Sequence, residues 1–373
     1  MLEIASAEGV YIYTRDGKRY TDLISGISVS ATGHRHPDVL RAIHEQLDHY
    51  LHVMVYGEFV QGPQVELARK LCSLLPPSLD SVYFVSTGAE ATEGALKLAK
   101  RATGRTQIVG FENAYHGSTH GALSVIGDEY FRRNYRPLLP GVSHLRFNEP
   151  EDLQYITTET ACVIAETIQG EAGIVVPDPN WLKLLRRRCD ETGALLILDE
   201  IQTGMGRCGS FMAFEQFGVL PDILLLAKGL GGGLPLGAFI SSNQLMKNLS
   251  HDPVLGHITT YGGNALCCAA GLAVTHLIAS EQLDKRALVL EQIIRTKLKH
   301  PAILEIRGRG LLLAAVFENQ QIAAAVMEKC MQNGLITDWF LFAPHCLRIA
   351  PPLTITDREL TEALEIFLSA CQH

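Results

Sequence analysis

The sequence predicts an α/β protein with a mostly parallel central sheet flanked by helices, together with a smaller α+β domain. The first observation is that short apolar runs alternate with helical patterns through the middle of the 373-residue chain, as parallel sheets require. The second is that runs such as LLIL and DILLLA are apolar at every position, which is typical of strands buried on both faces. The third is that longer helices with few strands replace this alternation after about residue 270.

The strands expected in the large sheet are Val82–Val85, Gln107–Phe111, Cys162–Ala165, Ala194–Leu198, Ile223–Ala227 and Ala238–Ile240. Two helices are expected from apolar faces, one formed by Val39, Leu40, Ile43 and Leu47 and one by Leu283, Leu288, Ile294 and Leu298. A third begins at Thr356, where Glu359 three residues later completes a capping box. Two further strands are expected at Leu311–Val316 and Leu347–Ile349.

Three segments follow from these patterns. Residues 39–270 form the large domain and residues 271–373 the small one. Residues 1–38 contain the hairpin pattern GVYIYTRDGKRY, and we expect them to pack with the small domain.

Composition excludes several classes of protein. With 47% hydrophobic and 19% charged residues, the chain has the balance of a globular protein and not of a disordered one. A net charge of −8 disfavours nucleic acid or an anionic membrane as a partner. Nine cysteines without a CxxC pair indicate reduced thiols, not disulfides or a zinc site. Because neither a signal peptide nor an apolar membrane span is evident, we expect a cytoplasmic protein.

Two charged residues follow buried strands. Asp199 ends the run ALLILD, and Lys228 follows DILLLA before a glycine-rich turn. Ligands of open parallel sheets bind beyond the carboxyl ends of the strands, where a desolvated lysine has a lowered pKa that suits Schiff-base chemistry. Each residue also has a plain structural interpretation: Asp199 as a helix cap beside a solvent-facing Glu200, and Lys228 as a lysine that reaches the surface.

Two more signals lie after neighbouring strands. The turn Ser86, Thr87, Gly88, Ala89 precedes a helix whose free N–H groups could bind phosphate, although an ordinary helix cap is the commoner case. Tyr115 and His116 follow another strand, and Tyr115 could stack on a flat ring or form part of a structural turn. Together the four signals describe a pocket for a phosphorylated pyridine aldehyde. The glycines do not fit the GxGxxG pattern of a nicotinamide site.

The order of motifs resembles the class III aminotransferases of the fold-type I, pyridoxal-phosphate-dependent superfamily, above all the acetylornithine and ornithine aminotransferase branch. The resemblance runs from about Gly9 to Leu364, nearly the whole chain. The motifs that carry it are SGISVSATGHRHP, STGAEATEGALKLAK, YHG, ETIQGEAGIVVPDP, DEIQTGMGR, AKGLGGGLPLGA, TTYGGN, IRGRGL and LRIAPPL.

The resemblance implies a role for each matching residue. Lys228 would bind pyridoxal 5′-phosphate as a Schiff base and move the proton, and Asp199 would hold the proton on the pyridine nitrogen. Gln202 would bond the phenolic oxygen, and Ile201 and Tyr115 would enclose the ring. The remaining cofactor contacts would come from Ser86, Thr87, Gly88, Ala89 and His116, and from Thr260 of a second subunit. That last match implies a homodimer with shared active sites.

The substrate residues follow the same resemblance. Glu171 and Arg348 match a pair in which the acid masks the arginine until a keto acid, here expected to be 2-oxoglutarate, binds in a ping-pong reaction. Ser118 stands where the branch usually has a carboxylate-binding arginine, and Ile27 stands where ornithine aminotransferase has a substrate-binding tyrosine. Either one of Arg132, Arg133 and Arg136 replaces the missing arginine, or the substrate differs.

The function expected from the resemblance is transfer of an amino group from an acetylornithine-like or other ω-amino donor to a keto acid. Glutamate-semialdehyde aminomutases and dialkylglycine decarboxylases share the fold and the lysine and are the main alternative. A non-catalytic homologue that binds the cofactor is a third, and it is disfavoured because Lys228, Asp199 and Gln202 are all present.

Overall fold

A seven-stranded sheet forms the centre of the larger part of the molecule. The computed structural model describes residues 1–372. The strand order is β4 (Ser81–Val85), β10 (Gly237–Ser241), β9 (Ile223–Leu226), β8 (Leu195–Asp199), β7 (Thr160–Glu166), β5 (Gln107–Phe111) and β6 (Val142–Leu145). Only β10 runs antiparallel to its neighbours. The mostly parallel sheet and all six expected strands are confirmed, while β6 was not expected because it is short and half polar.

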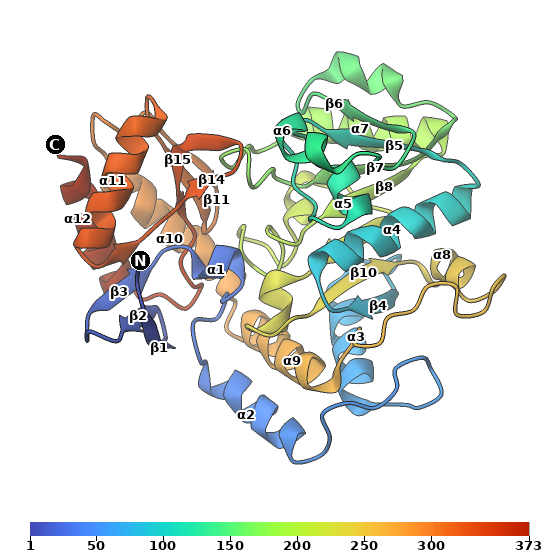
Figure 1. Cartoon of the computed structure of the whole chain (residues 1–373), viewed down its shortest axis with the longest axis horizontal. Coiled ribbons are helices and arrows are strands. Elements are labelled where there is room, and N and C mark those ends of the chain that lie inside the picture. Colours follow the sequence, from blue (N-terminus) through green and yellow to red (C-terminus); the bar gives the residue numbers. More distant parts are fainter. Residues whose placement is uncertain (373) are drawn as a thin grey trace.

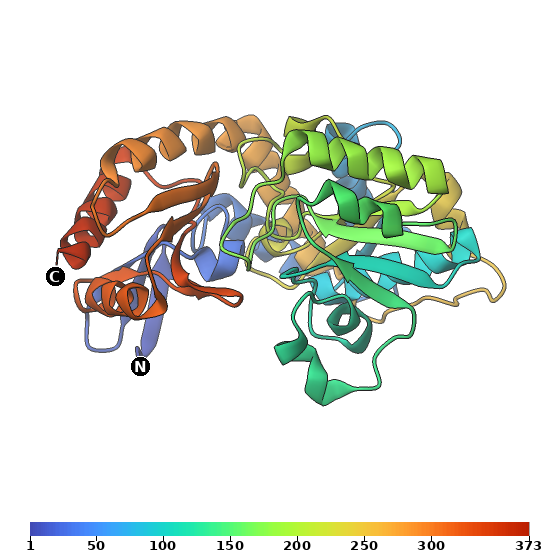
Figure 2. The ribbon, with the colours of Figure 1, turned by 90° about the horizontal axis from the view of Figure 1, so that it is seen from above.

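Helices cover both faces of this sheet, as Figure 2 shows from above. One face packs against α4 (Gly88–Thr103), where the ring of Phe239 on β10 fills the space beside Gly94. A Cβ atom at Gly94 would lie 2.3 Å from that ring, so only glycine fits there. The other face packs against α7 (Pro179–Thr192) through Trp181 and its neighbours. Successive side chains on a strand point to opposite faces of the sheet, and both faces are covered by helices. Strands of this sheet therefore have apolar residues at consecutive positions.

Helices α2 (Pro37–Leu47), α3 (Gly62–Leu74) and α9 (Ala265–Ser280) pack together below the sheet in Figure 1. The apolar face expected on α2 is partly wrong because Leu47 at its end is 44% exposed. Leu288 in the next helix, α10 (Leu283–Lys297), is likewise 39% exposed. Both helices have only one packed side, and these leucines lie at its margin.

The chain's two ends meet in the smaller part, at the left of Figure 1. An antiparallel sheet has the order β11 (Glu305–Arg309), β12 (Leu312–Val316), β15 (Ala343–Ile349) and β14 (Trp339–Phe340). A second sheet joins β1 (Ile4–Glu8), β2 (Tyr11–Thr14) and β3 (Arg19–Asp22) to β13 (Leu335–Ile336). The expected hairpin is thus β2–β3, and its pairing with β13 ties the N-terminus to the C-terminal part.

The remaining helices are short or belong to the C-terminal part: α1 (Ser25–Ser28), α5 (His120–Ser124), α6 (Glu129–Arg132), α8 (Asn243–Met246), α11 (Gln320–Gln332) and α12 (Asp357–Cys371). Helix α12 begins with the expected capping box of Thr356 and Glu359. Within residues 1–372, no single helix has the length and apolarity to cross a membrane, and only the bent pair α9–α10 meets those two criteria jointly. Helix α9 runs through residue 270, and the domain boundaries stay a prediction.

Candidate active site

A cavity of about 500 Å³ opens at the carboxyl ends of β4, β7, β8 and β9. It is lined by most of the residues that the sequence singles out: Ser86, Thr87, Gly88, Ala89, Tyr115, His116, Ser118, Glu171, Asp199, Ile201, Gln202 and Lys228. Two predicted site residues do not line it. Arg348 lies behind Glu171 and Gln202, and Thr260 lies beside Tyr56, with 3.5 Å between the two hydroxyl oxygens.

Lys228 follows β9 at the start of a 3₁₀ turn, Lys228–Gly231, and faces the cavity. Its backbone has a φ of 46°, a left-handed conformation that a non-glycine residue adopts only where the surroundings impose it. Desolvation lowers the pKa of the Lys228 amine, although the negative charge of Glu171 opposes the shift. A lysine with a lowered pKa has a larger fraction of the neutral, nucleophilic amine.

Asp199 ends β8 and is held on both oxygens. One oxygen accepts from the backbone N–H of Ile201 at 2.9 Å, and the other lies 2.7 Å from Nδ1 of His116. His116 is itself buried, and its carbonyl oxygen accepts a hydrogen bond from Thr92. The carboxylate is therefore fixed in a buried position at the cavity wall, where it can pair with a positive group of a ligand.

The start of α4 forms the end of the cavity near β4. Thr87 caps the helix by accepting from the N–H of Glu90, and the N–H groups of Gly88 and Ala89 lie in the first turn, where a helix has no internal acceptors. A Cβ atom on Gly88 would lie 2.8 Å from Ile201, so the backbone approaches the cavity closely. The Ser86 N–H donates to the Glu90 carboxylate at 2.7 Å. The turn can therefore be a helix cap and an anion site at the same time, because Thr87 caps through its side chain and leaves the N–H groups of Gly88 and Ala89 available.

Tyr115 and Ser118 lie at the opposite side, with 3.2 Å between their hydroxyl oxygens. None of the three nearby arginines lines the cavity. Arg132 and Arg136 form ion pairs with Glu129, at 3.0 and 2.6 Å. The guanidinium of Arg133 lies over the ring of Tyr130. The contacts therefore favour the alternative in which none of Arg132, Arg133 and Arg136 replaces the carboxylate-binding arginine that the branch usually has at the position of Ser118, so that the substrate differs.

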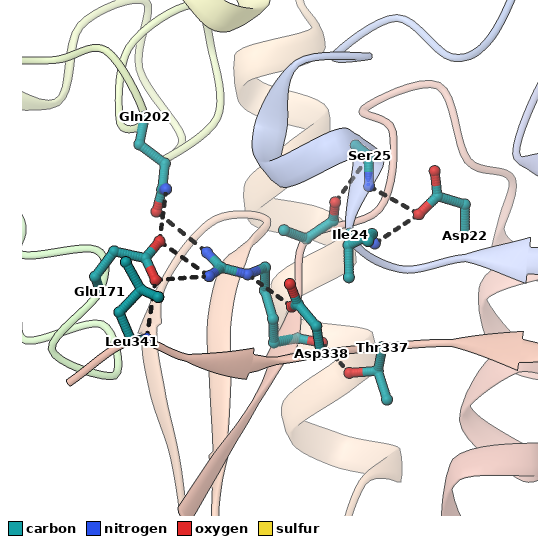
Figure 3. A network of polar contacts seen from close by, with 10 residues as sticks. Asp22, Ile24, Ser25, Glu171, Gln202, Thr337, Asp338 and Leu341 are labelled. Carbon is teal, nitrogen blue, oxygen red and sulfur yellow. Dashed lines mark hydrogen bonds and ion pairs between the residues drawn. The ribbon is translucent and has the colours of Figure 1, made fainter. Parts of the chain in front are cut away.

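Arg348 is completely buried and lies at the centre of a polar network (Figure 3). Its Nη2 donates to both oxygens of Glu171, at 3.0 and 3.2 Å, and its Nη1 donates to Oε1 of Gln202 at 3.4 Å. Burial alone would raise the pKa of Glu171, but the charges of Arg348 and Lys228 outweigh burial and lower it. Arg348 is therefore a buried arginine behind the cavity wall and not a surface arginine in a solvent-exposed ion pair.

Sequence reasoning missed three acidic residues. Glu166 ends β7, lines the cavity and accepts from the N–H groups of Tyr115 and Gly170. Burial raises its pKa to about 7.

Glu200 is 1% exposed and binds the backbone of Ala213, so its expected solvent-facing position is wrong. Asp338 binds Arg348. The rule that strand ends carry ligand-binding groups could have found Glu166, but no motif indicates Asp338.

These residues fit the pyridoxal phosphate that the resemblance implies. The cavity combines a lysine of lowered pKa, a fixed carboxylate, an aromatic and an aliphatic side chain, and free N–H groups at a helix start. Those groups match an aldehyde, a pyridine nitrogen, two ring faces and a phosphate, respectively. Lys228, Asp199, Tyr115, Ile201 and the start of α4 are the elements that would hold the group.

Comparisons with known proteins agree with this site. The family model described as aminotransferase class-III matches residues 1–371. An acetylornithine aminotransferase of Archaeoglobus fulgidus is 37% identical, over 98% of this chain and 94% of that one. A putrescine aminotransferase of Pectobacterium atrosepticum is 38% identical, over 97% and 80% of the two chains.

A solved structure is similar over the same length. The ornithine aminotransferase of Toxoplasma gondii, which contains pyridoxal phosphate at partial occupancy, has a TM-score of 0.91 and 30% identity over 99% of this chain and 89% of that one. The match covers both parts of the molecule and the motifs around the cavity. The chain therefore belongs to the class III aminotransferases, pyridoxal-phosphate-dependent enzymes of fold type I.

Proposed function

We propose that this aminotransferase takes the amino group of an ω-amino donor, acetylornithine-like or another primary amine, and passes it to a keto acid, with 2-oxoglutarate the expected acceptor. The observation that carries the proposal is the buried Arg348 behind Glu171. A guanidinium can bind a carboxylate through two parallel hydrogen bonds, and in this structure Nη2 of Arg348 is already occupied, because it donates to both oxygens of Glu171. A donor whose transferred amino group sits on a carbon without a carboxylate leaves the pair closed, whereas a keto acid needs Glu171 to turn away.

The side chains of this cavity divide the work of the reaction. Pyridoxal phosphate, when bound, supplies an electron sink for the bonds at the substrate Cα. Lys228 is the group within the cavity that can accept the proton from the reacting carbon and return it, because burial lowers its pKa. Asp199 would keep a proton on the pyridine nitrogen, and His116 holds the Asp199 carboxylate in place. Gln202 would bond the phenolic oxygen, and Tyr115 and Ile201 would exclude water from the two ring faces.

Ser118 favours a donor such as a diamine, whose far end carries no carboxylate, over an acetylornithine-like donor, and it leaves the distal carboxylate of 2-oxoglutarate without a cationic partner in this loop. The far end of the cavity offers the hydroxyls of Tyr115 and Ser118, and the loop arginines are engaged elsewhere. Hydroxyls bind neutral or amine groups well and lack the paired charge that a carboxylate requires. The similarity to a putrescine aminotransferase also supports a diamine as the second candidate donor.

A panel of substrates tests the proposal. The enzyme would be incubated with acetylornithine, ornithine, putrescine and 4-aminobutyrate, each with 2-oxoglutarate or pyruvate, and the amino acid products measured. Transfer from an ω-amine to a keto acid is the expected result. Isomerisation of glutamate semialdehyde, or release of carbon dioxide from a dialkylglycine without external transfer, would favour the alternative enzymes. Retention of the cofactor without any turnover would favour a non-catalytic homologue.

The same proposal includes the assembly and the location of the enzyme. A homodimer in which Thr260 of each subunit completes the phosphate site of the other agrees with the finding that Thr260 does not line the cavity of its own subunit. A cytoplasmic location is supported by nine cysteines that are all free.

A further inference from the structure

Arg348 is held by a second carboxylate, on the side of the guanidinium away from Glu171 (Figure 3). Its Nε donates to Oδ1 of Asp338 at 2.9 Å, whereas Glu171 and Gln202 occupy the two terminal nitrogens. The Arg348 backbone N–H also donates to the Asp338 carbonyl oxygen at 2.8 Å. The same residue thus fixes the main chain and the side chain of Arg348.

Two neighbours strengthen this arrangement. Thr337 donates to the Arg348 carbonyl oxygen at 2.7 Å, and the guanidinium carbon lies 4.2 Å from the centroid of the Phe340 ring. Thr337 and Asp338 lie between β13 and β14, and Phe340 lies in β14, which pairs with β15. The next residues contact Glu171: the Leu341 N–H donates to its carboxylate at 3.2 Å, and the Phe342 N–H donates to its carbonyl oxygen at 3.0 Å. The hydrogen bond from Nε of Arg348 to Asp338 does not involve Glu171, so it can persist when the Glu171 side chain turns away.

We propose that Asp338 is a positioning residue for the acceptor: it keeps Nε occupied and the guanidinium fixed, so that only the Nη1–Nη2 edge is offered to the keto-acid carboxylate when Glu171 turns away. Without Asp338, the guanidinium could rotate and follow Glu171, and the pair would stay closed. Arginine binds carboxylates through either edge, so a fixed edge requires a group that blocks the other. This inference rests on the proposed function, because it concerns binding of a keto acid at Arg348.

Two substitutions distinguish the effect of fixing the Arg348 guanidinium from the effect of the negative charge of Asp338. In Asp338→Asn the amide oxygen still accepts from Nε, so the KM for 2-oxoglutarate should stay within about threefold of the wild-type value. In Asp338→Ala the contact is lost, and this KM should rise at least about thirtyfold, the lower end of the range for breaking a buried charged pair. The KM for putrescine, which has no carboxylate, should not change in either variant. A purely structural role would change both KM values together and would give no rescue by asparagine.

A matched control comes from a pair far from the cavity. Asp152 is 9% exposed and binds Arg146 through both oxygens, at 2.7 and 3.0 Å. Asp152→Ala should lower the melting temperature without changing either KM. A wild-type KM for 2-oxoglutarate in folded Asp338→Ala would overturn the inference.

A second measurement does not depend on the folding of Asp338→Ala. Glu171→Ala keeps the Nε contact, so calorimetry of the holoenzyme should show that glutarate, an unreactive dicarboxylate, binds at least as tightly as to the wild type. Loss of glutarate binding in Glu171→Ala would show that Glu171, and not Asp338, holds Arg348, and would overturn the inference. Absence of transfer to any keto acid by the wild type would instead contradict the proposed function, and the glutarate result would still test Asp338.

Discussion

The strained backbone of Lys228 shows how the fold places an amine inside the cavity. β9 is buried along its whole length, and the turn after it must leave the sheet within one residue. Lys228 follows β9 with a positive φ, so its side chain projects toward Glu171 and Asp199 instead of toward solvent. Strain of this kind costs on the order of 1–3 kcal/mol and persists where the surrounding structure imposes it.

Lys228→Ala should keep the cofactor through the other contacts and lose transamination by at least ~10²–10⁴-fold, because the nucleophile and the acid–base group are removed together. In the wild type, borohydride reduction followed by peptide mapping should locate the cofactor on the peptide that contains Lys228. Labelling of Lys97 or Lys100 would contradict this assignment. Both lie on α4 and do not line the cavity, so they serve as internal controls.

Glu166 gives the stability a pH dependence. Burial raises its pKa to about 7, so between about pH 4.5 and 7 the folded state keeps a proton that the unfolded state has released. The unfolded state then binds fewer protons, and stability falls as the pH rises through this window. Well above pH 7 the free energy of unfolding has lost the whole contribution of the protonated Glu166, which is on the order of 3 kcal/mol relative to low pH.

Glu166→Gln should therefore reduce the fall in melting temperature between pH 5 and pH 8. The measurement is the difference in melting temperature between pH 5 and pH 8. A value at a single pH would be misleading, because glutamine cannot accept from both the Tyr115 and Gly170 N–H groups and so loses stability at every pH. Glu200, whose pKa is also raised to about 7, leaves a residual pH dependence in the variant. An unchanged difference between pH 5 and pH 8 would show that Glu166 is ionised in the folded protein.

We expect the loop after β5 to influence which acceptor the cavity prefers. It carries Tyr115 and Ser118 at the cavity, and farther along Arg132 and Arg136 bind Glu129 and do not line the cavity. Ser118→Arg should raise kcat/KM for 2-oxoglutarate relative to pyruvate by about tenfold or more, since a guanidinium adds a paired, charge-assisted contact to the distal carboxylate. The ratio of the two kcat/KM values is the measurement.

Alanine at Arg132 is the control for this loop. Arg132 lies between Glu129 and His144, so its removal should leave the ratio unchanged. If alanine at Arg132, Arg133 or Arg136 abolished the use of 2-oxoglutarate, that arginine would bind the acceptor after all and Ser118 would not explain the preference.

The elements that the sequence predicts correctly are those with a local signal. Six strands of the large sheet follow from short apolar runs, and α12 follows from the side chains of Thr356 and Glu359. Asp199 and Lys228 stand at strand ends, where topology alone brings them into one cavity. Contacts between distant segments have no such signal. The Arg348–Glu171 pair joins residues 177 positions apart and was expected from family resemblance alone.

An exposed apolar face lies apart from the active-site cavity. It surrounds a second cavity of about 590 Å³ between the segments near residues 55–65 and 246–263. Several large apolar residues on it are exposed, including Val60 at 91%, Val254 at 73% and Phe59 at 58%. Contiguous apolar patches of this kind usually mark an interface. Thr260 belongs to the same face, which supports a dimer whose interface brings Thr260 to the partner's cavity.

Mixing two inactive variants tests this shared site. In a Lys228→Ala subunit Thr260 is intact, and in a Thr260→Ala subunit Lys228 is intact, so a mixed dimer has one cavity with both residues and one with neither. Random exchange of equal amounts should restore about a quarter of the wild-type sites, measured as transamination at limiting pyridoxal phosphate. If Thr260 served its own subunit, every cavity would lack one of the two residues and mixing would restore nothing. An active monomer in sedimentation at the assay concentration would also contradict the shared site, because its cavity would then be complete without the partner.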